Sequence, residues 1–443
     1  MTSFLVRRHA LSLWNAERRI QGSLPVPGLT REGVRQAREW AESLPSRAGY
    51  TAVWSSDAAR ARQTAAPAAR WLGLPVLSTE ALREVGAGVL EGCRHADAER
   101  EHVDAYRHWM ARGDLDAVPG AETGDELQAR CLSFVAVAAG PGNVGRQIVV
   151  THAATMRSLV NTCLGRPRTT PLAVGHGDVH ELHDPWERLA PQQLGASWRP
   201  PVFRVDTAGR RYVLKTRTAR MDDLYSRVDR AIGAPHALAV VTDPRAPESV
   251  VVARHFVPGR TVPHRISVAD EFRLWDFLER VARTTSDAVT GPETAGLPTL
   301  ADRVAGALGH VTEATSQLRR LVADGRVTDL LARREAVADF DLHRDNVVAD
   351  RSGLTKIDGD GLCAGPAAWP VAAALVGASA LYPSATPASE RPHALMDESA
   401  ELRILVRVRL LLGLSFFCTG VRATSTAAEP YRELYRRAIE ATA

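Results

Sequence analysis

The sequence predicts a two-domain α/β protein: an α/β/α sandwich first, then a second α+β domain that changes from strands to helices. The chain has 443 residues, about three times the length of a typical single domain, so two hydrophobic cores are expected. Up to about residue 165, short apolar runs alternate with helical stretches, which is the pattern of a parallel sheet covered by helices. A different pattern begins near residues 184–190, after Asp184 and Pro185.

The individual elements follow from their hydrophobic patterns. Strands are expected at SFLVRR, TAVWSS and RQIVVTHA, with DVHELH as a closing edge strand, and helices at REGVRQAREWAESL and ARQTAAPAARWLG. Beyond the boundary, PVFRVDTAGRRYVLKTR reads as a hairpin that turns at Gly209, and amphipathic helices dominate from about residue 268. We therefore predict domains at 1–185 and 186–443, with catalytic groups at the carboxyl ends of the parallel strands.

Composition excludes several classes of protein. With 45% hydrophobic and 24% charged residues, the chain is globular and not disordered. The net charge of +4 comes from arginines spread along the chain, so no nucleic-acid partner is expected. The five cysteines form no CxxC pair, which suits a reducing compartment. Neither a secretory signal nor a run of about 20 apolar residues is present, so we expect a cytoplasmic protein without a membrane partner.

Four separated motifs occur in the first domain: FLVRRHALSLWN, SSDAARARQTA, LREVGAGVLEG and IVVTHAATMRSL. The first places Arg8 and His9 directly after a buried strand. Together, and in this order, the motifs resemble those of the histidine phosphatase family, also called phosphoglycerate mutase-like. The resemblance covers about residues 3–184 and implies a three-layer α/β/α sandwich of the phosphoglycerate mutase type.

The resemblance also implies the roles of the site residues. His9 would form a phosphohistidine and Glu84 would be the general acid. Residues expected to bind the phosphoryl oxygens are Arg8, Asn15, Arg60 and His152. Guanidinium groups suit this task because they match phosphate oxygens with charge-assisted hydrogen bonds, and a carboxyl group can protonate the leaving oxygen and later activate water. Ala10 and Ala153 stand where the family usually has glycine.

A second set of motifs lies in the second domain. Lys215 is on the second arm of the expected hairpin, and Lys215 and Lys356 are the only lysines in an arginine-rich chain. The segment VADFDLHRDNVVADRSGLTKIDGDG resembles the catalytic segment of aminoglycoside phosphotransferases and choline kinases, which have a two-lobed, protein-kinase-like α+β fold. The resemblance implies that Asp341 is the base that accepts the proton of a substrate hydroxyl. The cofactors implied are ATP, held by Gly195, Ser197 and Lys215, and Mg²⁺, held by Asn346 and Asp358.

The second domain departs from that family in two places. Asp339 and Phe340 stand where His-Gly is usual. No glutamate occurs between Lys215 and Glu248, so the acid that pairs with the lysine has to be one of three aspartates, Asp222, Asp223 or Asp229.

The two resemblances predict a bifunctional phosphoryl-transfer enzyme that hydrolyses a phosphomonoester and phosphorylates a hydroxyl group of a small polar metabolite. Aminoglycosides, sugars and nucleoside-like compounds, in secondary metabolism, are the expected class of kinase substrate. Two alternatives stay open: a phosphatase regulated by an inactive, metabolite-sensing kinase-like domain, and a phosphomutase in the first half. The segments near 93–125 and 265–335, where substrate specificity is expected to reside, carry no pattern that identifies a substrate, and the oligomeric state is equally open.

Overall fold

The computed structural model divides the chain into two compact units, which are described separately. Unit 1 comprises Met1–Asp222 and Ala237–Phe256, and unit 2 comprises Asp223–His236 and Val257–Ala443. The residues described are 1–45, 49–112, 115–172, 174–194, 201–261, 268–290, 292–340, 342, 346–351, 353–357, 361–376, 399–419, 422–424 and 429–441.

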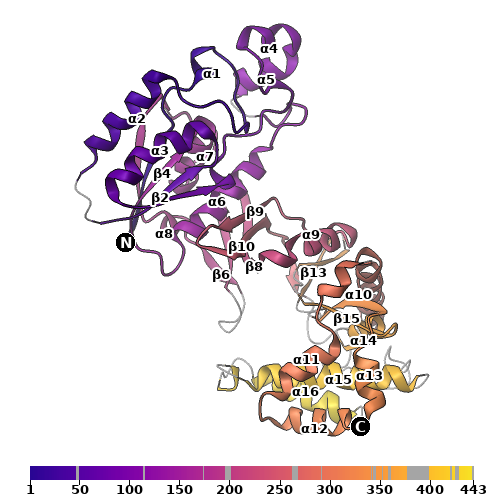
Figure 1. The fold of residues 1–443 in the computed structure, drawn as a ribbon. Helices are drawn as coiled ribbons and strands as arrows, with labels where there is room; N and C mark the ends of the chain where they lie inside the picture. Colours follow the sequence, from indigo (N-terminus) through magenta and orange to yellow (C-terminus); the bar gives the residue numbers. More distant parts are fainter. Residues whose placement is uncertain are drawn as a thin grey trace. The chain divides into compact units, whose positions relative to one another are not determined.

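The first sheet of unit 1 has the strand order β3-β2-β4-β1-β5 (Figure 1). Its strands are β1 (Thr2–Arg8), β2 (Tyr50–Ser56), β3 (Val76–Thr79), β4 (Gly145–Thr151) and β5 (Val179–His183). The first four are parallel, whereas β5 pairs antiparallel with β1 and closes the edge. The parallel strands therefore end at one edge of the sheet, as the sequence predicts.

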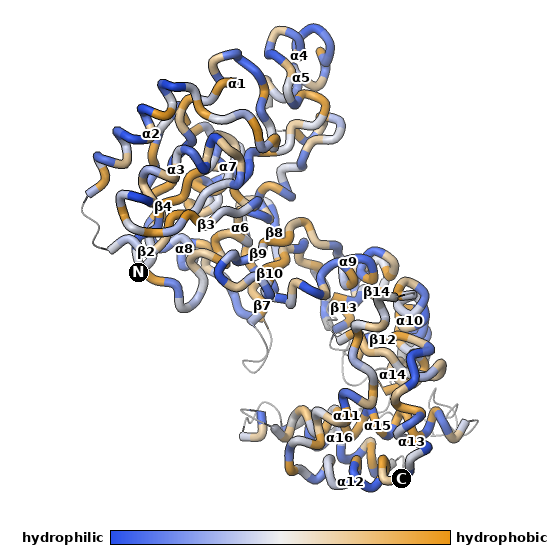
Figure 2. The backbone as a smooth tube through the Cα atoms, viewed as in Figure 1, coloured by the Kyte–Doolittle hydropathy of each residue, from blue (hydrophilic) through white to orange (hydrophobic). Residues whose placement is uncertain are grey.

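Helices cover both faces of this sheet. Helices α2 (Arg31–Ser43) and α3 (Ala59–Leu72) lie on one face, and α6 (Gly124–Ala139), α7 (Ala153–Cys163) and α8 (Pro185–Arg188) lie on the other. Unit 1 also contains α1 (Leu13–Ala16) and the pair α4 (His95–Glu101) and α5 (Val103–Arg112), which packs in a separate hydrophobic cluster. Neighbouring residues of a strand enter different cores: Val53 packs with α2 and α3, whereas Trp54 packs with α6 and α7. This alternation has the period of two expected of a strand, and it gives the predicted α/β/α layers. Figure 2 shows apolar residues along β4 and its neighbours.

A second sheet belongs to unit 1. It is antiparallel, with the order β6-β7-β8-β10-β9, and consists of β6 (Gln192–Leu194), β7 (Val202–Thr207), β8 (Arg210–Thr218), β9 (Ala239–Asp243) and β10 (Ala246–His255). The predicted hairpin that turns at Gly209 is β7 and β8. Tyr212 and Leu214 of β8 share one hydrophobic core with Phe134 of α6. Helix α6 is thus covered by a sheet on each side, and most of its residues are buried.

Polar contacts tie the second sheet to α6. The Tyr212 hydroxyl donates to Gln128 Oε1 at 3.0 Å, and Arg210 Nε donates to Asp125 Oδ2 at 3.0 Å. The Arg245 guanidinium donates to the carbonyl oxygen of Val137 at 2.7 Å. The predicted boundary at residues 185 and 186 falls at the start of α8, inside unit 1. The compact units therefore do not follow that division, because α6 can bury its outer face only under the second sheet.

Unit 2 is mainly helical. Its helices are α9 (Asp222–Ala231), which starts at the junction of the units, α10 (Val268–Ala288), α11 (Leu300–Leu308), α12 (Glu313–Val322), α13 (Gly325–Leu331), α14 (Trp369–Leu375), α15 (Ala400–Phe417) and α16 (Glu429–Ala441). Two small sheets accompany them: β11 (Arg260–Thr261), β13 (Val347–Asp350) and β14 (Gly353–Lys356) form one, and β12 (Ala336–Asp339) and β15 (Leu362–Gly365) the other. Leu405, Val408 and Leu411 of α15 are fully buried. Among the described residues, no helix is both long and apolar enough to span a bilayer.

Candidate active site

The motif residues of the first half meet at the carboxyl edge of the first sheet. Arg8 ends β1 and His9 follows it, Arg60 lies in the first turn of α3 after β2, and His152 follows β4. Glu84 comes shortly after β3. All five line one pocket with a cavity volume of about 300 Å³. The four parallel strands thus bring together residues that are up to 144 positions apart in the sequence.

His9 has the geometry of a nucleophile. Its side chain is 2% exposed, and its Nδ1 lies 2.7 Å from the carbonyl oxygen of Ala10. Because a carbonyl oxygen only accepts hydrogen bonds, Nδ1 carries the proton and Nε2 keeps its lone pair. Burial, followed by the positive charges of Arg60 and Arg8, holds the pKa of His9 well below its usual value. The imidazole is therefore neutral at pH 7, with a free electron pair on Nε2.

His152 is the second buried imidazole, and its ring centroid lies 5.1 Å from that of His9. Arg60 Nε donates to His152 Nδ1 at 3.3 Å, which leaves the proton on Nε2. This Nε2 is buried and has no hydrogen-bond partner among the described residues. A buried donor without a partner is costly, so the geometry suits a hydrogen bond to a bound phosphoryl oxygen. Burial, then the charge of Arg60, lowers the pKa of His152 well below its usual value, so this ring is also neutral at pH 7.

Arg60 and Arg8 supply the positive charge of the pocket. The Arg60 guanidinium is held by the carbonyl oxygens of Leu24 and Gly22, to which Nη1 and Nη2 donate at 2.8 and 3.1 Å. Burial lowers the pKa of Arg60 to about 10, so the group stays charged at pH 7. Arg8 Nη1 donates to the carbonyl oxygen of Val174 at 2.7 Å, and burial also lowers the pKa of Arg8. Fixed guanidinium groups in a buried site stabilise a phosphoryl group without having to reorganise.

Asn15 also lines the pocket, as the sequence predicts. Its Oδ1 accepts hydrogen bonds from the backbone N and the Oγ of Ser12, at 3.3 and 2.8 Å. The oxygen end of the amide is therefore occupied by the cap of α1. The amide nitrogen, Nδ2, is the donor that remains for a ligand.

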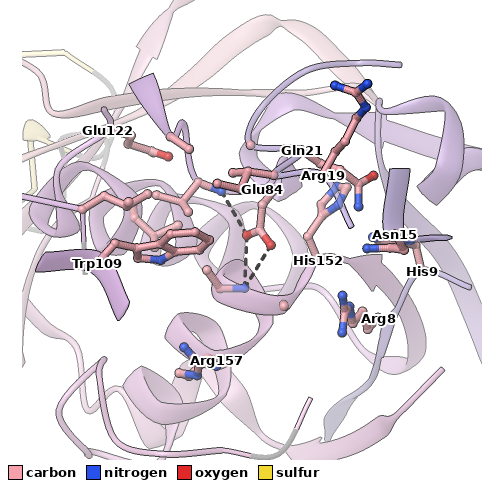
Figure 3. A pocket seen from close by; sticks show the side chains of 18 of the residues that line it. Arg8, His9, Asn15, Arg19, Gln21, Glu84, Trp109, Glu122, His152 and Arg157 are labelled. Carbon is pink, nitrogen blue, oxygen red and sulfur yellow. Dashed lines mark hydrogen bonds between the residues drawn. The ribbon is translucent and has the colours of Figure 1, made fainter. Parts of the chain in front are cut away.

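Glu84 lies beside His152, on the side toward Trp109, in the view of Figure 3. Its Oε1 accepts from three backbone N–H groups, those of Val85, Ala154 and Thr155, at 3.0, 3.1 and 3.2 Å. Oε2 receives only one bond, shared with Oε1, from Ala154 at 3.2 Å. The first turn of α7 thus holds one carboxylate oxygen in place. Oε2 is the oxygen that can exchange a proton with a ligand.

Sequence reasoning did not single out several residues around the site. Residues 174–178 wrap around Arg8, and His176 places its ring centroid 6.5 Å from that of His9. Arg157 of α7 lines the pocket, and its Nε is buried without a hydrogen-bond partner among the described residues. Trp109, from the segment near 93–125, lines the pocket as well. The position of Arg157, five residues after His152 on α7, is a signal that could have been used, but nothing in the sequence marks Trp109.

The residues predicted for the second activity are described only in part. Lys215 is on β8, where it pairs with Val202 of β7 and Val252 of β10, so it occupies the middle of the second sheet. Asn346 lies directly before β13 and is buried. The predicted ATP-binding and metal-binding residues Gly195, Ser197 and Asp358, and the predicted base Asp341, lie outside the described residues. Within the described part of the chain, no group of three His, Cys, Asp or Glu side chains could hold a metal ion.

The structure also places the residues that depart from the kinase pattern. Asp222, one of the aspartates expected to pair with Lys215, has an Oδ1 3.7 Å from Arg217 Nη1. Asp339 forms a buried ion pair with Lys356, with 2.7 Å between Nζ and Oδ2. The second lysine of the chain thus compensates a buried carboxylate in unit 2.

Comparisons with known proteins find relatives of the first half of the chain. Residues 4–184 match the family described as histidine phosphatase superfamily (branch 1). A probable phosphoglycerate mutase GpmB of Enterobacter sp. is 36% identical over 161 residues, which are 36% of this chain and 74% of that protein. The protein of the same description from Citrobacter koseri is 36% identical over 210 residues, or 46% of this chain and 90% of the relative. A solved mycobacterial glucosyl-3-phosphoglycerate phosphatase is 29% identical, with a TM-score of 0.33 and coverage of 38% of this chain and 81% of the other.

Proposed function

The chain belongs to the histidine phosphatase superfamily, and on this basis we propose that it hydrolyses phosphate monoesters through a phosphohistidine on His9. The proposal is supported above all by the tautomers of the two histidines. His9 keeps its lone pair on Nε2, and His152 offers an unpartnered N–H beside it. A nucleophile and a donor for the phosphoryl oxygens are therefore ready without any proton transfer within the protein.

The reaction has two steps. In the first, His9 Nε2 forms a bond to phosphorus, the bond from phosphorus to the ester oxygen breaks, and Glu84 gives its proton to that oxygen. In the second, the Glu84 carboxylate takes a proton from water, whose oxygen attacks phosphorus, and the bond to Nε2 breaks. Phosphate leaves and both side chains return to their starting states. Arg8, Arg60 and His152 stabilise the phosphoryl oxygens throughout.

The test is phosphate release from a panel of phosphate monoesters by the wild type and His9→Asn. We expect His9→Asn to abolish release, and the wild type to form an acid-labile phosphoenzyme that the variant lacks. A mutase would instead return the phosphoryl group to an alcohol, so isomerised product with little free phosphate would support that alternative. Equal phosphate release by both proteins would contradict the proposed mechanism.

We propose ATP-dependent phosphorylation of a small polar metabolite as a second activity of this chain. One observation favours it: the N–H of Ile357 donates to the carbonyl oxygen of Asn346 at 2.9 Å. The β13–β14 hairpin therefore brings Asn346 close to the chain that leads into Asp358. Asn346 and Asp358 would hold Mg²⁺, and their oxygen atoms suit this cation, which bridges the phosphates of ATP in kinases.

Consumption of ATP in the presence of Mg²⁺ tests this second activity. Wild type, Asn346→Ala and Asp341→Ala are compared against a panel of aminoglycosides, sugars and nucleosides. Loss of ATP consumption in both variants, with unchanged phosphatase activity, is the expected result. If the wild type binds ATP without turnover, the kinase proposal is wrong, and the result supports a metabolite-sensing domain that regulates the phosphatase.

A further inference from the structure

The pocket has two chemically different halves. The inner half holds the charged and imidazole groups that surround the phosphoryl position. The outer half combines an apolar surface, formed by Ile20, Val85, Ala87, Trp109, Leu115 and Leu127, with polar side chains that include Arg19, His95, Glu122 and Arg168. Apolar lining in a pocket of this size indicates that part of the ligand is itself apolar, because such a surface gains free energy only when it excludes water.

The outer half is built on a small core of its own. Ile20, Ala87 and Leu115 belong to a buried cluster, and Trp109 packs against it. His95 stacks on Trp109, with ring centroids 5.8 Å apart and an interplanar angle of 19°. Tyr106 meets both rings edge-on, at 5.9 and 6.0 Å. The indole is therefore held by contacts with two neighbouring rings, of which His95 also lines the pocket.

The surroundings of these rings do not favour a cationic ligand, since Glu122, which also lines the pocket, is already paired with Arg130. The three rings contact one another and leave no space between them, so they do not form a cage around an ammonium group. Burial, then the charge of Arg18, lowers the pKa of His95, so this ring is neutral at pH 7. Arg19, Arg157 and Arg168 also line the pocket. A flat, uncharged group therefore suits the surface of Trp109 better than a cation does.

The order of the groups fixes the direction of the substrate. In Figure 3, Glu84 lies between His152 and Trp109. The ester oxygen has to face Glu84, because this residue protonates it, and the phosphoryl group occupies the side of His9 and His152. The carbon skeleton of the alcohol therefore extends beyond Glu84, toward Trp109.

We propose that this site selects phosphate monoesters whose alcohol carries an aromatic or other flat, apolar group, and that this group packs on Trp109. The proposal rests on the proposed phosphatase function and specifies its class of substrate. Trp109 is then a specificity-determining residue, since it contacts the leaving group and not the reacting phosphorus.

Two substrates test the selection without any variant. 2-Phenylethyl phosphate and ethyl phosphate have leaving alcohols of similar acidity, but only the first carries a ring. We expect kcat/KM of the wild type to be about ten- to a hundredfold higher for 2-phenylethyl phosphate, the effect of burying one aromatic ring against another. Equal values for the two substrates would overturn the proposal.

Variants locate the effect. Trp109→Ala should remove most of the preference by lowering kcat/KM for 2-phenylethyl phosphate, with little change for ethyl phosphate, and Trp109→Phe should retain much of it. Met110→Ala is the matched control, because Met110 is the next residue of α5 and is 60% exposed. Inhibition by vanadate should be the same in all four proteins, which shows that the inner half is intact. A preference that survives in Trp109→Ala would place the apolar group elsewhere.

The failure of this inference differs from a failure of the proposed function. If His9→Asn releases phosphate as fast as the wild type, the phosphohistidine mechanism is wrong whatever the substrate. If His9→Asn is inactive and the wild type does not distinguish the two esters, the mechanism stands and only the substrate class is wrong.

Discussion

The proton-transfer role of Glu84 predicts that the effect of Glu84→Gln depends on the leaving group. An alkyl phosphate releases an alkoxide unless its oxygen is protonated, whereas 4-nitrophenyl phosphate releases a stable anion. General acid catalysis contributes about 10²- to 10⁴-fold, or about 3–5 kcal/mol of barrier. We therefore expect Glu84→Gln to lower kcat by this factor for 2-phenylethyl phosphate. For 4-nitrophenyl phosphate the first step should slow by less than about tenfold, since it needs no acid.

The structure indicates that Glu84→Gln leaves the site folded. The glutamine carbonyl can replace Oε1, which accepts the N–H groups of Val85, Ala154 and Thr155. We expect the free energy of unfolding to fall by about 1 kcal/mol. Glu84→Ala would be a poorer test, because it leaves three N–H groups without their acceptor.

Single-turnover kinetics measures the first step directly, as alcohol or nitrophenol released before the phosphoenzyme is hydrolysed. Glu80→Gln is the matched control, because Glu80 lies four residues before Glu84 and its side chain is 76% exposed. Urea denaturation of both variants separates stability from chemistry. If Glu84→Gln slowed the first step equally for the two esters, Glu84 would not be the proton donor.

Three further predictions concern stability. Truncation after Leu189 removes the second sheet and exposes α6, so we expect aggregation or loss of a cooperative thermal transition, measured by size-exclusion chromatography and calorimetry. The pKa values of His9 and His152 in the folded state lie below the value of about 6.5 in the unfolded state, so both residues contribute stability above pH 6.5 that is lost as the pH falls. The drop in thermal midpoint between pH 7.5 and pH 5.5 should therefore be smaller in a His9→Asn, His152→Asn double variant than in the wild type. Lys356→Met removes the buried ammonium group that pairs with Asp339 Oδ2 and should cost about 3–5 kcal/mol in urea denaturation, with much of this recovered in Asp339→Leu, Lys356→Met.

The layers of the first half could be predicted because strand and helix periodicity are local properties of the sequence. The apolar run before Arg8 and the run before His152 become β1 and β4, which pair in parallel as expected. The convergence of Arg8, His9, Arg60, Glu84 and His152 follows from this, since each comes soon after a parallel strand. The histidine tautomers could not be predicted, because they depend on one carbonyl oxygen and one guanidinium placed by the tertiary structure.

The division into compact units shows where local patterns stop being informative. The hairpin that turns at Gly209 is predicted by its pattern, but the sequence analysis assigns it to the second domain, and its packing partner in unit 1 is not visible in the sequence. Helix α6 carries apolar residues around most of its circumference, and Phe134 and Leu132 are fully buried. Such a helix needs cover on more than one side, which was a usable signal for the packing of β8 and β10 on it. The position of Trp109 at the pocket had no comparable signal.

Two alanines, Ala10 and Ala153, stand in the motifs of the phosphoryl-binding site. Ala10 and Ala153 replace glycines, yet neither has a positive φ, so neither position needs the conformational freedom of glycine. Ala10 is fully buried, and its N–H donates to Thr64 Oγ1 at 3.1 Å. Ala153 opens α7, where a helical conformation suits alanine well. The phosphoryl-binding half therefore keeps its reactive geometry despite the added methyl groups.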